Sequence, residues 1–312
     1  MSWSSDVSRS GPRPLAVDFT TGTEGADSTT LHIAAPWLGG AHREEIFAHA
    51  TPLRSESGLQ LYQCGGLLLG HAHDPMVEVE LADRTQSVYR RMLDACVGRH
   101  LFRIWNYVPR INAVTAGFEN YRAFCLGRSL AFEQKLGPSF AAALPAASAV
   151  GSCGQHLEVI FVAGESVPQH FENPAQVPAY LYPPEHGPRA PSFARATTAR
   201  DGAQTYTFIS GTAAIRGHET VAPGSLGEQL DCTLENLRLI SSAAGLGEQL
   251  GAQRSARRFF KIYLRHPADL TVVRQRLETN LLQPEDTVIY LQADICREAL
   301  SLEIEATLVS SG

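Results

Sequence analysis

The chain has 312 residues, of which 44% are hydrophobic and 19% charged, the balance of an ordinary globular protein with its own core. The net charge of −6 argues against a nucleic-acid partner, although a local group of arginines could still hold a small anionic substrate. Six cysteines are spread along the chain without a CxxC pair, which predicts reduced thiols rather than a disulfide framework or a zinc site.

The first 13 residues are Ser-rich and are predicted to be disordered. They contain no apolar region of the kind found in secretory signals, and no run of 18 apolar residues occurs anywhere in the chain. We therefore expect a soluble cytoplasmic protein that does not contact a membrane.

In the first half of the chain, strand-like patterns occur at residues 30–34, 59–69, 76–80, 101–108 and 156–163. Helical spacing of apolar residues predicts helices at 82–97 and 120–136. Seven prolines between residues 168 and 191 exclude a helix or a central strand there and predict an ordered connection between two halves.

In the second half, strands are predicted at residues 205–210, 259–265, 288–294 and 300–309, and helices at 226–246 and 268–281. The order strand, helix, strand, helix, strand occurs in both halves. The sequence therefore predicts a mixed α/β fold with an internal duplication, divided into an N-terminal half at 14–190 and a C-terminal half at 191–312.

The last predicted strand carries two carboxylates. Alternation places Leu302 and Ile304 on one face and Glu303 and Glu305 on the other. The simpler interpretation is a half-exposed strand with a solvated acidic face. The functional interpretation is that one glutamate faces a cleft, keeps its proton near neutral pH and serves as a general acid.

Arginines and a cysteine are the other candidates. The simpler interpretation is that the arginine side chains face solvent. The functional interpretation is that they bind a substrate carboxylate through paired hydrogen bonds, and it concerns Arg122, Arg128 and Arg195. Cys296 lies seven residues before Glu303, and a lone cysteine is usually a small buried hydrophobe.

The segment Ser210-Gly211-Thr212 follows a predicted strand, where it forms either an anion cradle or an ordinary turn. Neither a GxSxG elbow nor a phosphate-binding loop occurs, and His218-Glu219 lacks the HExxH partner of a zinc site. The residues alone therefore give no metal or nucleotide motif.

Six segments in order resemble the chorismatase family: RIWNYVPRIN (103–112), FENYRAFCLGR (118–128), PSFARA (191–196), ISGTAAIRGHET (209–220), YLRHPAD (263–269) and YLQADICREALSLEIEA (290–306). They span about two-thirds of the chain. The last segment also resembles the terminal strand of YjgF/RidA proteins. The resemblance implies two YjgF/RidA-like halves in one chain, with helices packed on one face of mixed sheets.

The resemblance implies that the substrate is chorismate, a dianion with an enolpyruvyl ether. Glu303 matches the family's catalytic glutamate, which protonates the enolpyruvyl group so that pyruvate is released. This chemistry needs no metal and no cofactor. Arg122, Arg128, Arg195 and also Arg265 are the implied carboxylate-binding residues. Tyr180 and the backbone of Gly211, Thr212 and Ala213 are expected to shape the pocket.

Cys296 matches a cysteine that occurs in the aromatising members of the family. The resemblance therefore implies 3-hydroxybenzoate as product, with 4-hydroxybenzoate as a further one. The chain most resembles bifunctional members that supply pigment and ubiquinone synthesis. A duplicated chain contains interfaces that shorter relatives gain by trimerising, so we expect a monomer.

Two alternatives remain open besides a purely structural protein. The first is a chorismatase that only hydrolyses its substrate to a dihydroxycyclohexadiene carboxylate, and Cys296 argues against it. The second is a YjgF/RidA-like protein that binds or deaminates small imines. The length of the chain and the block at residues 103–112 argue against that reading.

Overall fold

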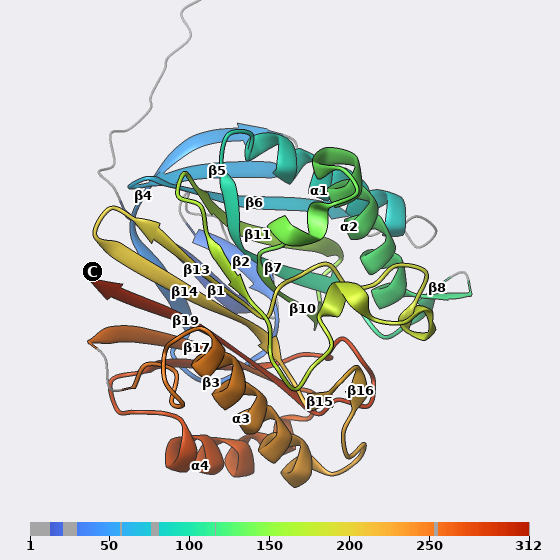
Figure 1. Cartoon of the computed structure of the whole chain (residues 1–312), viewed down its shortest axis with the longest axis vertical. Coiled ribbons are helices and arrows are strands. Elements are labelled where there is room, and N and C mark those ends of the chain that lie inside the picture. The colour runs from blue at the N-terminus through green and yellow to red at the C-terminus, as the bar shows by residue number, and fades with distance from the viewer. Residues whose placement is uncertain are drawn as a thin grey trace, which may run out of the picture.

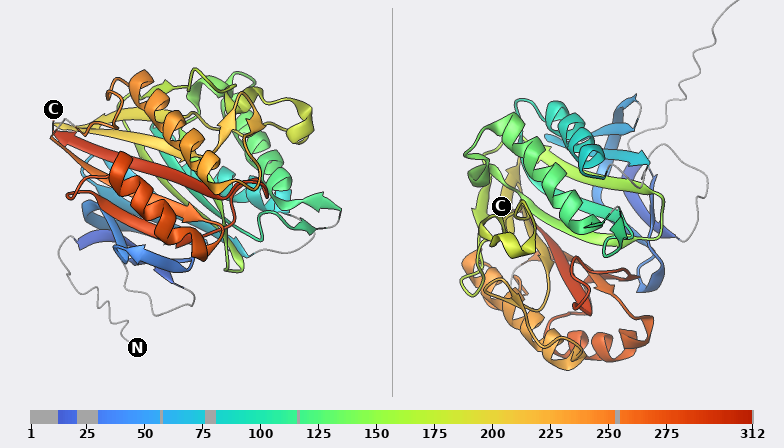
Figure 2. Two further views of the ribbon diagram at one scale, coloured as in Figure 1. Left: turned by 90° about the horizontal axis from the view of Figure 1, so that it is seen from below. Right: turned by 90° about the vertical axis from the view of Figure 1, so that its right-hand side faces the viewer.

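The structure is a computed structural model that describes residues 13–20, 30–56, 58–75, 81–115, 117–252 and 255–311. Two mixed β-sheets pack face to face, and a pair of helices covers the outer face of each sheet, which gives four layers (Figure 1 and Figure 2). None of the described helices is long and apolar enough to cross a membrane.

The first sheet comprises, among the described residues, eight strands in the order β10-β7-β11-β6-β5-β4-β1-β2. These strands are β1 (Arg13–Thr20), β2 (Thr30–Ala34), β4 (Arg43–Glu56), β5 (Leu59–Cys64), β6 (Leu67–Pro75), β7 (His100–Pro109), β10 (Ala146–Ser152) and β11 (His156–Gly164). Helices α1 (Leu81–Ala95) and α2 (Asn120–Leu136) pack on the outer face through one apolar cluster that includes Met92, Phe124 and Phe161.

The second sheet comprises, over the same described ranges, seven strands in the order β12-β13-β14-β19-β17-β18-β3. These strands are β3 (Trp37–Gly40), β12 (Gln169–Phe171), β13 (Ala196–Asp201), β14 (Gln204–Thr212), β17 (Ala256–Leu264), β18 (Thr287–Gln292) and β19 (Leu302–Ser311). Helices α3 (Leu226–Ala243) and α4 (Leu270–Asn280) cover its outer face.

Two short hairpins lie outside the sheets. One joins β8 (Val114–Thr115) to β9 (Phe118–Glu119), directly before α2, and the other joins β15 (Ile215–Arg216) to β16 (Glu219–Thr220), before α3. Short 3₁₀ turns occur at Phe140–Ala143, Ala179–Leu181, Pro184–His186 and Pro267–Asp269.

The two halves share one topology, which confirms the predicted duplication. In each half, two antiparallel strands precede a helix, a strand, a second helix and two more strands. The spatial order β5-β6-β11-β7-β10 therefore matches β13-β14-β19-β17-β18. The strand pairs β7–β10 and β17–β18 are both parallel, as a connection through a helix requires.

The sheets approach each other most closely along β10. This strand consists of small residues (AASAVGS), so the backbone of the opposite sheet can come near. Ala146 N–H donates to Thr197 Oγ1 at 2.7 Å, and Ala147 N–H donates to Ser210 Oγ at 2.9 Å. Direct hydrogen bonds thus join the two sheets at this seam.

Most of the predicted elements are confirmed, the 120–136 helix to the residue. The single strand predicted at 59–69 is wrong, because Gly65 and Gly66 form a turn that divides it into β5 and β6. Of the two interpretations of the last strand, the half-exposed acidic face is wrong, since Glu303 and Glu305 are 3% and 2% exposed. Both faces of β19 are buried, one by the helices and the other by the first sheet.

The Pro-rich connection contains only the edge strand β12 and short 3₁₀ turns, in agreement with prediction. The boundary at residue 190 stays a prediction. Both β3 and β12 precede it and pair with strands of the second sheet. The segments predicted as a disordered end (1–13) and as a strand (76–80) lie outside the described residues, apart from Arg13, where β1 begins.

Candidate active site

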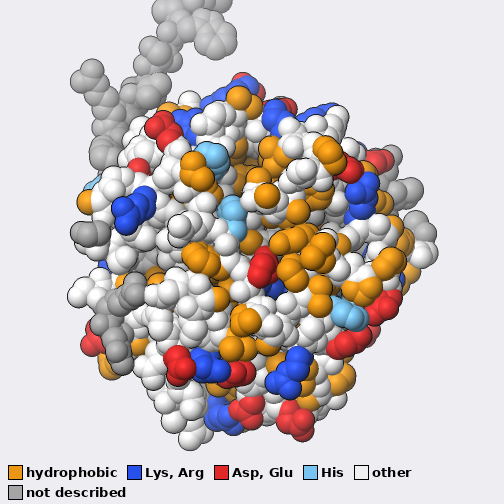
Figure 3. Space-filling model, viewed as in Figure 1, with side chains coloured by type: hydrophobic (Ala, Val, Ile, Leu, Met, Phe, Trp, Pro, Cys, Tyr) orange, Lys and Arg blue, Asp and Glu red, His pale blue; other side chains and the backbone are white. Residues whose placement is uncertain are grey.

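A cavity of about 460 Å³ opens where β10 of the first sheet meets β14 and β19 of the second. Helix α2, the Pro-rich connection, the β15–β16 hairpin and the loop before β19 complete its wall. Hydrophobic side chains gather on the face of the molecule shown in Figure 3, between the helices α1 and α2 and the β15–β16 hairpin.

Glu303 forms part of the cavity wall and projects from β19 toward the seam between the sheets. Burial is the main cause that raises the pKa of its carboxyl to about 8, and the nearby charge of Glu305 adds to the effect. Among the described residues, no group donates or accepts a hydrogen bond at its Oε1 atom. Glu303 is therefore a protonated carboxylic acid at neutral pH with an oxygen free for a ligand.

Glu305 points the same way but is surrounded by cations. Its carboxylate accepts hydrogen bonds from Arg103 and from the Trp105 indole, each at 2.7 Å, and it lies 3.0 Å from the Lys261 ammonium. Burial alone would raise its pKa, but Lys261 and Arg103 more than offset this and hold the pKa below its usual value. Glu305 is therefore ionised.

Gly211 on β14 makes room for the Glu303 side chain. A Cβ atom at this position would overlap the Glu303 carboxyl and would crowd Ser148 on β10. No side chain larger than hydrogen fits here while Glu303 keeps its position. The carboxyl thus lies where the two sheets come closest.

Two arginines in the cavity wall have no carboxylate partner within the described part of the chain. Arg128 from α2 is 1% exposed and stacks on the Phe124 ring, and its Nε–H is unsatisfied. Arg297 donates to the carbonyl of His218 at 2.8 Å and to Thr220 at 3.2 Å. Arg128 is thus a buried cation and Arg297 a half-buried one, and cations that lack a counter-ion inside a protein favour an anionic ligand.

Arg195 lies beside them with only a weak partner. Its guanidinium donates to the Tyr182 hydroxyl at 2.8 Å, whereas the Glu172 carboxylate is 4.0 Å from its Nε. Burial raises the pKa of Glu172 to about 7, so this carboxyl carries only part of a charge at neutral pH. Arg195 is thus a third cation that is incompletely neutralised inside the protein.

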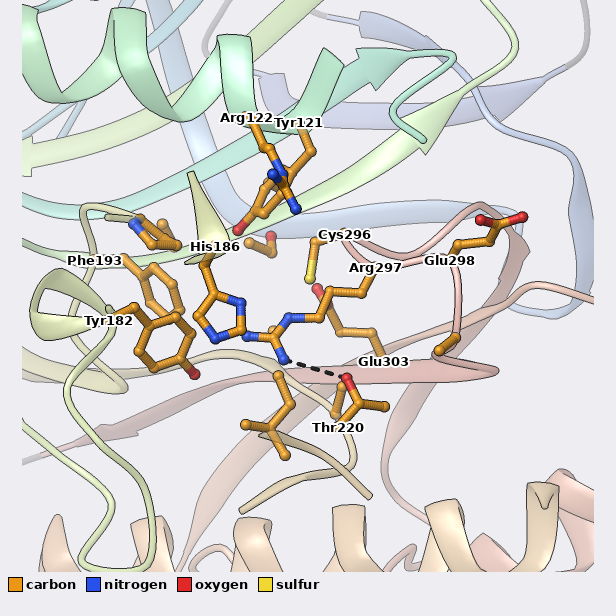
Figure 4. A pocket seen from close by; sticks show the side chains of 18 of the residues that line it. Tyr121, Arg122, Tyr182, His186, Phe193, Thr220, Cys296, Arg297, Glu298 and Glu303 are labelled. Carbon is orange, nitrogen blue, oxygen red and sulfur yellow. Dashed lines mark hydrogen bonds between the residues drawn. The ribbon is translucent and has the colours of Figure 1, made fainter. Parts of the chain in front are cut away.

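Cys296 lies next to Glu303 in the loop before β19 (Figure 4). Burial, and then the charge of Glu303, raises the pKa of its thiol to about 12. The sulfur is therefore a neutral thiol rather than a thiolate nucleophile at physiological pH. Tyr121 from α2 also faces the cavity, and burial raises the pKa of its hydroxyl well above the usual value.

Figure 4 shows two facing walls. Tyr182 and His186 from the Pro-rich connection, and Phe193 just after it, lie on one side, and the loop with Cys296 and Arg297 lies on the other. The Arg297 guanidinium extends over the Tyr182 ring, 5.4 Å from its centroid. Arg122 reaches the cavity from α2 and pairs with Glu119 at 2.9 Å.

Seven of the ten residues predicted from the sequence line this cavity: Arg122, Arg128, Arg195, Gly211, Ala213, Cys296 and Glu303. Three do not. Tyr180 packs against the apolar cluster of α1 and α2. The Thr212 hydroxyl donates to the carbonyl of Ser210, so it is not free to form the anion cradle considered for Ser210-Gly211-Thr212.

Arg265 is the third residue outside the cavity wall. Its guanidinium donates to the carbonyls of Ile295, Arg297 and Leu300, and it pairs with Asp294. All of these partners belong to the loop that carries Cys296 and Arg297. Arg265 therefore holds this loop in position.

Tyr182, His186, Phe193 and Arg297 line the cavity but were not predicted as site residues from the sequence. Arg297 is adjacent to Cys296, and a strand through both would have turned their side chains to opposite faces. The chain instead forms a loop there, and both side chains reach the cavity. Tyr182, His186 and Phe193 lie in or just after the Pro-rich connection, which has no periodic pattern that would have identified them as site residues.

Comparisons with known proteins identify the family of the chain. The family model described as "Chorismatase FkbO/Hyg5-like, N-terminal" matches residues 45–163. A 3-hydroxybenzoate synthase of Streptomyces hygroscopicus is 41% identical over 219 residues, and the match covers 67% of this chain and 63% of that protein, less than two-thirds of its length. A chorismatase of Streptomyces rapamycinicus is 38% identical over 310 residues, 89% of this chain and 90% of that protein.

Among solved structures, a chorismatase determined at 1.08 Å resolution is 29% identical and has a TM-score of 0.80, with 98% of this chain and 95% of that chain covered. The YjgF gene product of E. coli is 18% identical and covers 45% of this chain, with a TM-score of 0.31. Because the chain is 38% identical to the S. rapamycinicus chorismatase over 90% of that protein's length, it belongs to the chorismatase family of enzymes.

Proposed function

We propose that this enzyme cleaves chorismate to pyruvate and a hydroxybenzoate. The observation that carries the proposal is the juxtaposition of a neutral Glu303 carboxyl with arginines whose charge is incompletely neutralised, above all the buried Arg128. Chorismate offers the complementary chemistry, because it has two carboxylates and an enol ether that acid can cleave.

The carboxylates of the substrate bind to the cations of the cavity wall. Arg128, Arg195 and Arg297 supply planar guanidinium groups, which bind carboxylates through paired hydrogen bonds. Arg122 is 43% exposed at the side chain and already paired, so it contributes at the entrance rather than at the base of the site. The rings of Tyr182 and Phe193 provide the apolar walls for the carbocycle.

Glu303 then donates its proton to the methylene carbon of the enolpyruvyl group, which generates an oxocarbenium ion. The proton is available because the pKa of the acid lies near the working pH. The carboxylate left behind stabilises the cation. Glu305 stays ionised throughout and is held too firmly by Arg103 and Lys261 to serve as the donor.

The fate of the ring decides the product. If the ring 4-hydroxyl attacks the carbon that bears the ether oxygen, the bond from that carbon to the ether oxygen breaks and pyruvate leaves in its keto form. The hydroxyl proton returns to the Glu303 carboxylate, and the resulting arene oxide opens to 3-hydroxybenzoate. No water is consumed on this route, whereas hydrolysis to the dihydroxycyclohexadiene carboxylate consumes one. The neutral thiol of Cys296 beside Glu303 supports the aromatising route, because it occupies space that a water molecule would need.

The test is to incubate the purified protein with chorismate and to separate the products by chromatography. We expect pyruvate in an amount equal to the sum of the aromatic products, with 3-hydroxybenzoate as one of them and 4-hydroxybenzoate as the second product of a bifunctional enzyme. Release of pyruvate with only the dihydroxycyclohexadiene carboxylate would assign the hydrolysing subtype. Unconsumed chorismate would overturn the proposal, and turnover of small imines would then be examined.

Three further expectations belong to this proposal: a monomer in solution, a cytoplasmic location, and a role in supplying hydroxybenzoate to pigment and ubiquinone synthesis. A single species of the chain mass in size-exclusion chromatography with light scattering would support the monomer, and a dimer or trimer would contradict it.

A further inference from the structure

Two histidines meet at the entrance of the cavity. His186 ends the 3₁₀ turn Pro184–His186, and His218 lies in the β15–β16 hairpin. The His186 Nε2 and His218 Nδ1 atoms are 3.0 Å apart. The Glu185 carboxylate oxygen lies 3.8 Å from the first nitrogen and 3.6 Å from the second.

These distances match one face of a coordination tetrahedron. Zinc bound to nitrogen and oxygen ligands at about 2.0–2.1 Å separates neighbouring ligand atoms by roughly 3.3 Å. The three separations here bracket that value within about half an ångström, so small side-chain movements would bring all three atoms onto one ion. A Glu219 oxygen lies 3.3 Å from the His218 nitrogen. Within this group, however, only the ligand atoms of Glu185, His186 and His218 all lie within 4.8 Å of one another, so Glu219 would have to move to supply a fourth ligand.

The backbone fixes the position of both imidazoles. His186 follows Pro183 and Pro184 and precedes Gly187, which adopts a φ of 135°. His218 follows Gly217, whose φ of 59° forms the hairpin turn. The Tyr182 ring contacts both imidazoles, with ring centroids 5.2 and 6.3 Å apart. A site held by two rigid turns loses little entropy when it binds an ion.

The local charges permit a dication. The positive charge of Arg297 opposes a cation, because its guanidinium lies close enough to donate a hydrogen bond to the backbone carbonyl of His218. Glu185 and Glu219 offset it with two carboxylates, whose side chains are 60% and 70% exposed and so leave an open path from solvent. Neutral imidazole with carboxylate is a ligand set that suits zinc and the neighbouring divalent transition metals.

We propose that Glu185, His186 and His218 bind one divalent transition-metal ion at the entrance of the cavity, with Glu219 or water completing the coordination. The spacing of His218-Glu219 gave no sign of such a site, because the partner residues come from a segment more than thirty positions earlier in the chain. The proposed proton transfer from Glu303 does not use this ion, so the metal site and the chorismate reaction are tested separately.

The experiment uses tag-free protein that has been treated with a chelator. Cobalt(II) is added and the visible ligand-field absorption is recorded, and zinc(II) binding is measured by calorimetry. We expect one tight site per chain and the intense absorption of tetrahedral cobalt. Weak binding without that absorption, or a stoichiometry that does not approach one, would overturn the proposal.

Three variants assign the site. His186→Ala and His218→Ala should abolish the tetrahedral absorption. Glu185→Gln, at an exposed position that the fold does not depend on, should weaken zinc binding by at least roughly tenfold, since even losing a partner of a metal ligand costs that much. His156→Ala is the matched control, because this histidine packs against His73 elsewhere on the protein. Equal affinity in Glu185→Gln and the control, or loss in the control, would contradict the assignment.

Discussion

Glu303 and Glu305 lie two residues apart on the same face of β19, yet their surroundings move their pKa values in opposite directions. Burial, and then the charge of Glu305, raises the pKa of Glu303 to about 8, against a smaller opposing effect of Arg103 and Arg195. Lys261 and Arg103 hold the pKa of Glu305 below its usual value despite burial. Separation of two carboxyl pKa values by environment is how proteins assign acid and counter-ion roles within one site.

The first prediction concerns the pH dependence of kcat/KM. Because the reactive form of Glu303 is protonated, kcat/KM should be constant below about pH 7 and fall above about pH 8, by about tenfold per pH unit. The profile is measured by pyruvate release at limiting chorismate. A rate that rises through this range, or that stays flat to about pH 9, would exclude Glu303 as the acid.

The second prediction concerns stability. A carboxyl that keeps its proton when folded but loses it at its ordinary pKa of 4.5 when unfolded makes the free energy of unfolding fall as the pH rises from about 4.5 to about 8. Glu303→Gln removes this dependence, so its stability advantage over the wild type should grow across that window, to the order of a few kcal/mol.

Urea unfolding of both proteins at several pH values tests this expectation. The exposed Glu285→Gln serves as the control and should follow the wild type at every pH. Parallel curves for the wild type and Glu303→Gln would mean that Glu303 has an ordinary pKa in the folded protein.

The third prediction separates two buried arginines. Arg103→Met leaves Glu305 with one cation fewer and should destabilise the protein by about 3–5 kcal/mol. Arg128→Met removes a cation that has no carboxylate partner among the described residues, so stability should be kept. The same change should raise KM for chorismate by on the order of 100-fold. An unchanged KM in a folded Arg128→Met variant would exclude this residue from substrate binding.

The fourth prediction concerns Gly211. An added methyl group would displace the Glu303 carboxyl, so Gly211→Ala should lower kcat by on the order of 100-fold while the protein still folds. Gly227→Ala is the control for a glycine in the same half of the chain, since nothing lies near the added Cβ there and its φ is not positive. Activity of Gly211→Ala within a few-fold of the wild type would contradict the close approach.

The fifth prediction concerns Cys296. Replacement by alanine opens space beside Glu303 for a water molecule, so Cys296→Ala should shift the product from hydroxybenzoate toward the dihydroxycyclohexadiene carboxylate while pyruvate release continues. The exposed Cys153→Ala is the control. An unchanged product spectrum, measured by chromatography, would show that Cys296 only packs.

The helices and the central strands were predictable because each has a local pattern. Residues 120–136 carry apolar side chains at helical spacing, and apolar and polar side chains alternate in β19 from Leu302 to Leu308. The strand β4 was not predictable, since it is rich in charged residues and contains Pro52, which is accommodated where the pairing register shifts. Small residues in β10 likewise carry no strand signal but allow the close contact between the sheets.

The candidate site was predictable only where the family resemblance named its residues. The alternation of β19 placed Glu303 and Glu305 together, but their different protonation depends on Lys261 and Arg103, which come from other strands. The pairing of His186 with His218 and the exposure of Arg297 to the cavity are likewise tertiary properties. No pattern within one segment contains them.

The protonation state of Glu303 in the resting protein is the most direct test of this account. Infrared difference spectra between the wild type and Glu303→Gln at neutral pH would isolate the signal of this one carboxyl. We predict the carbonyl stretch of a protonated acid, which should be replaced by carboxylate bands as the pH passes about 8. Carboxylate bands already present at about pH 6 would contradict the assignment of Glu303 as the proton donor.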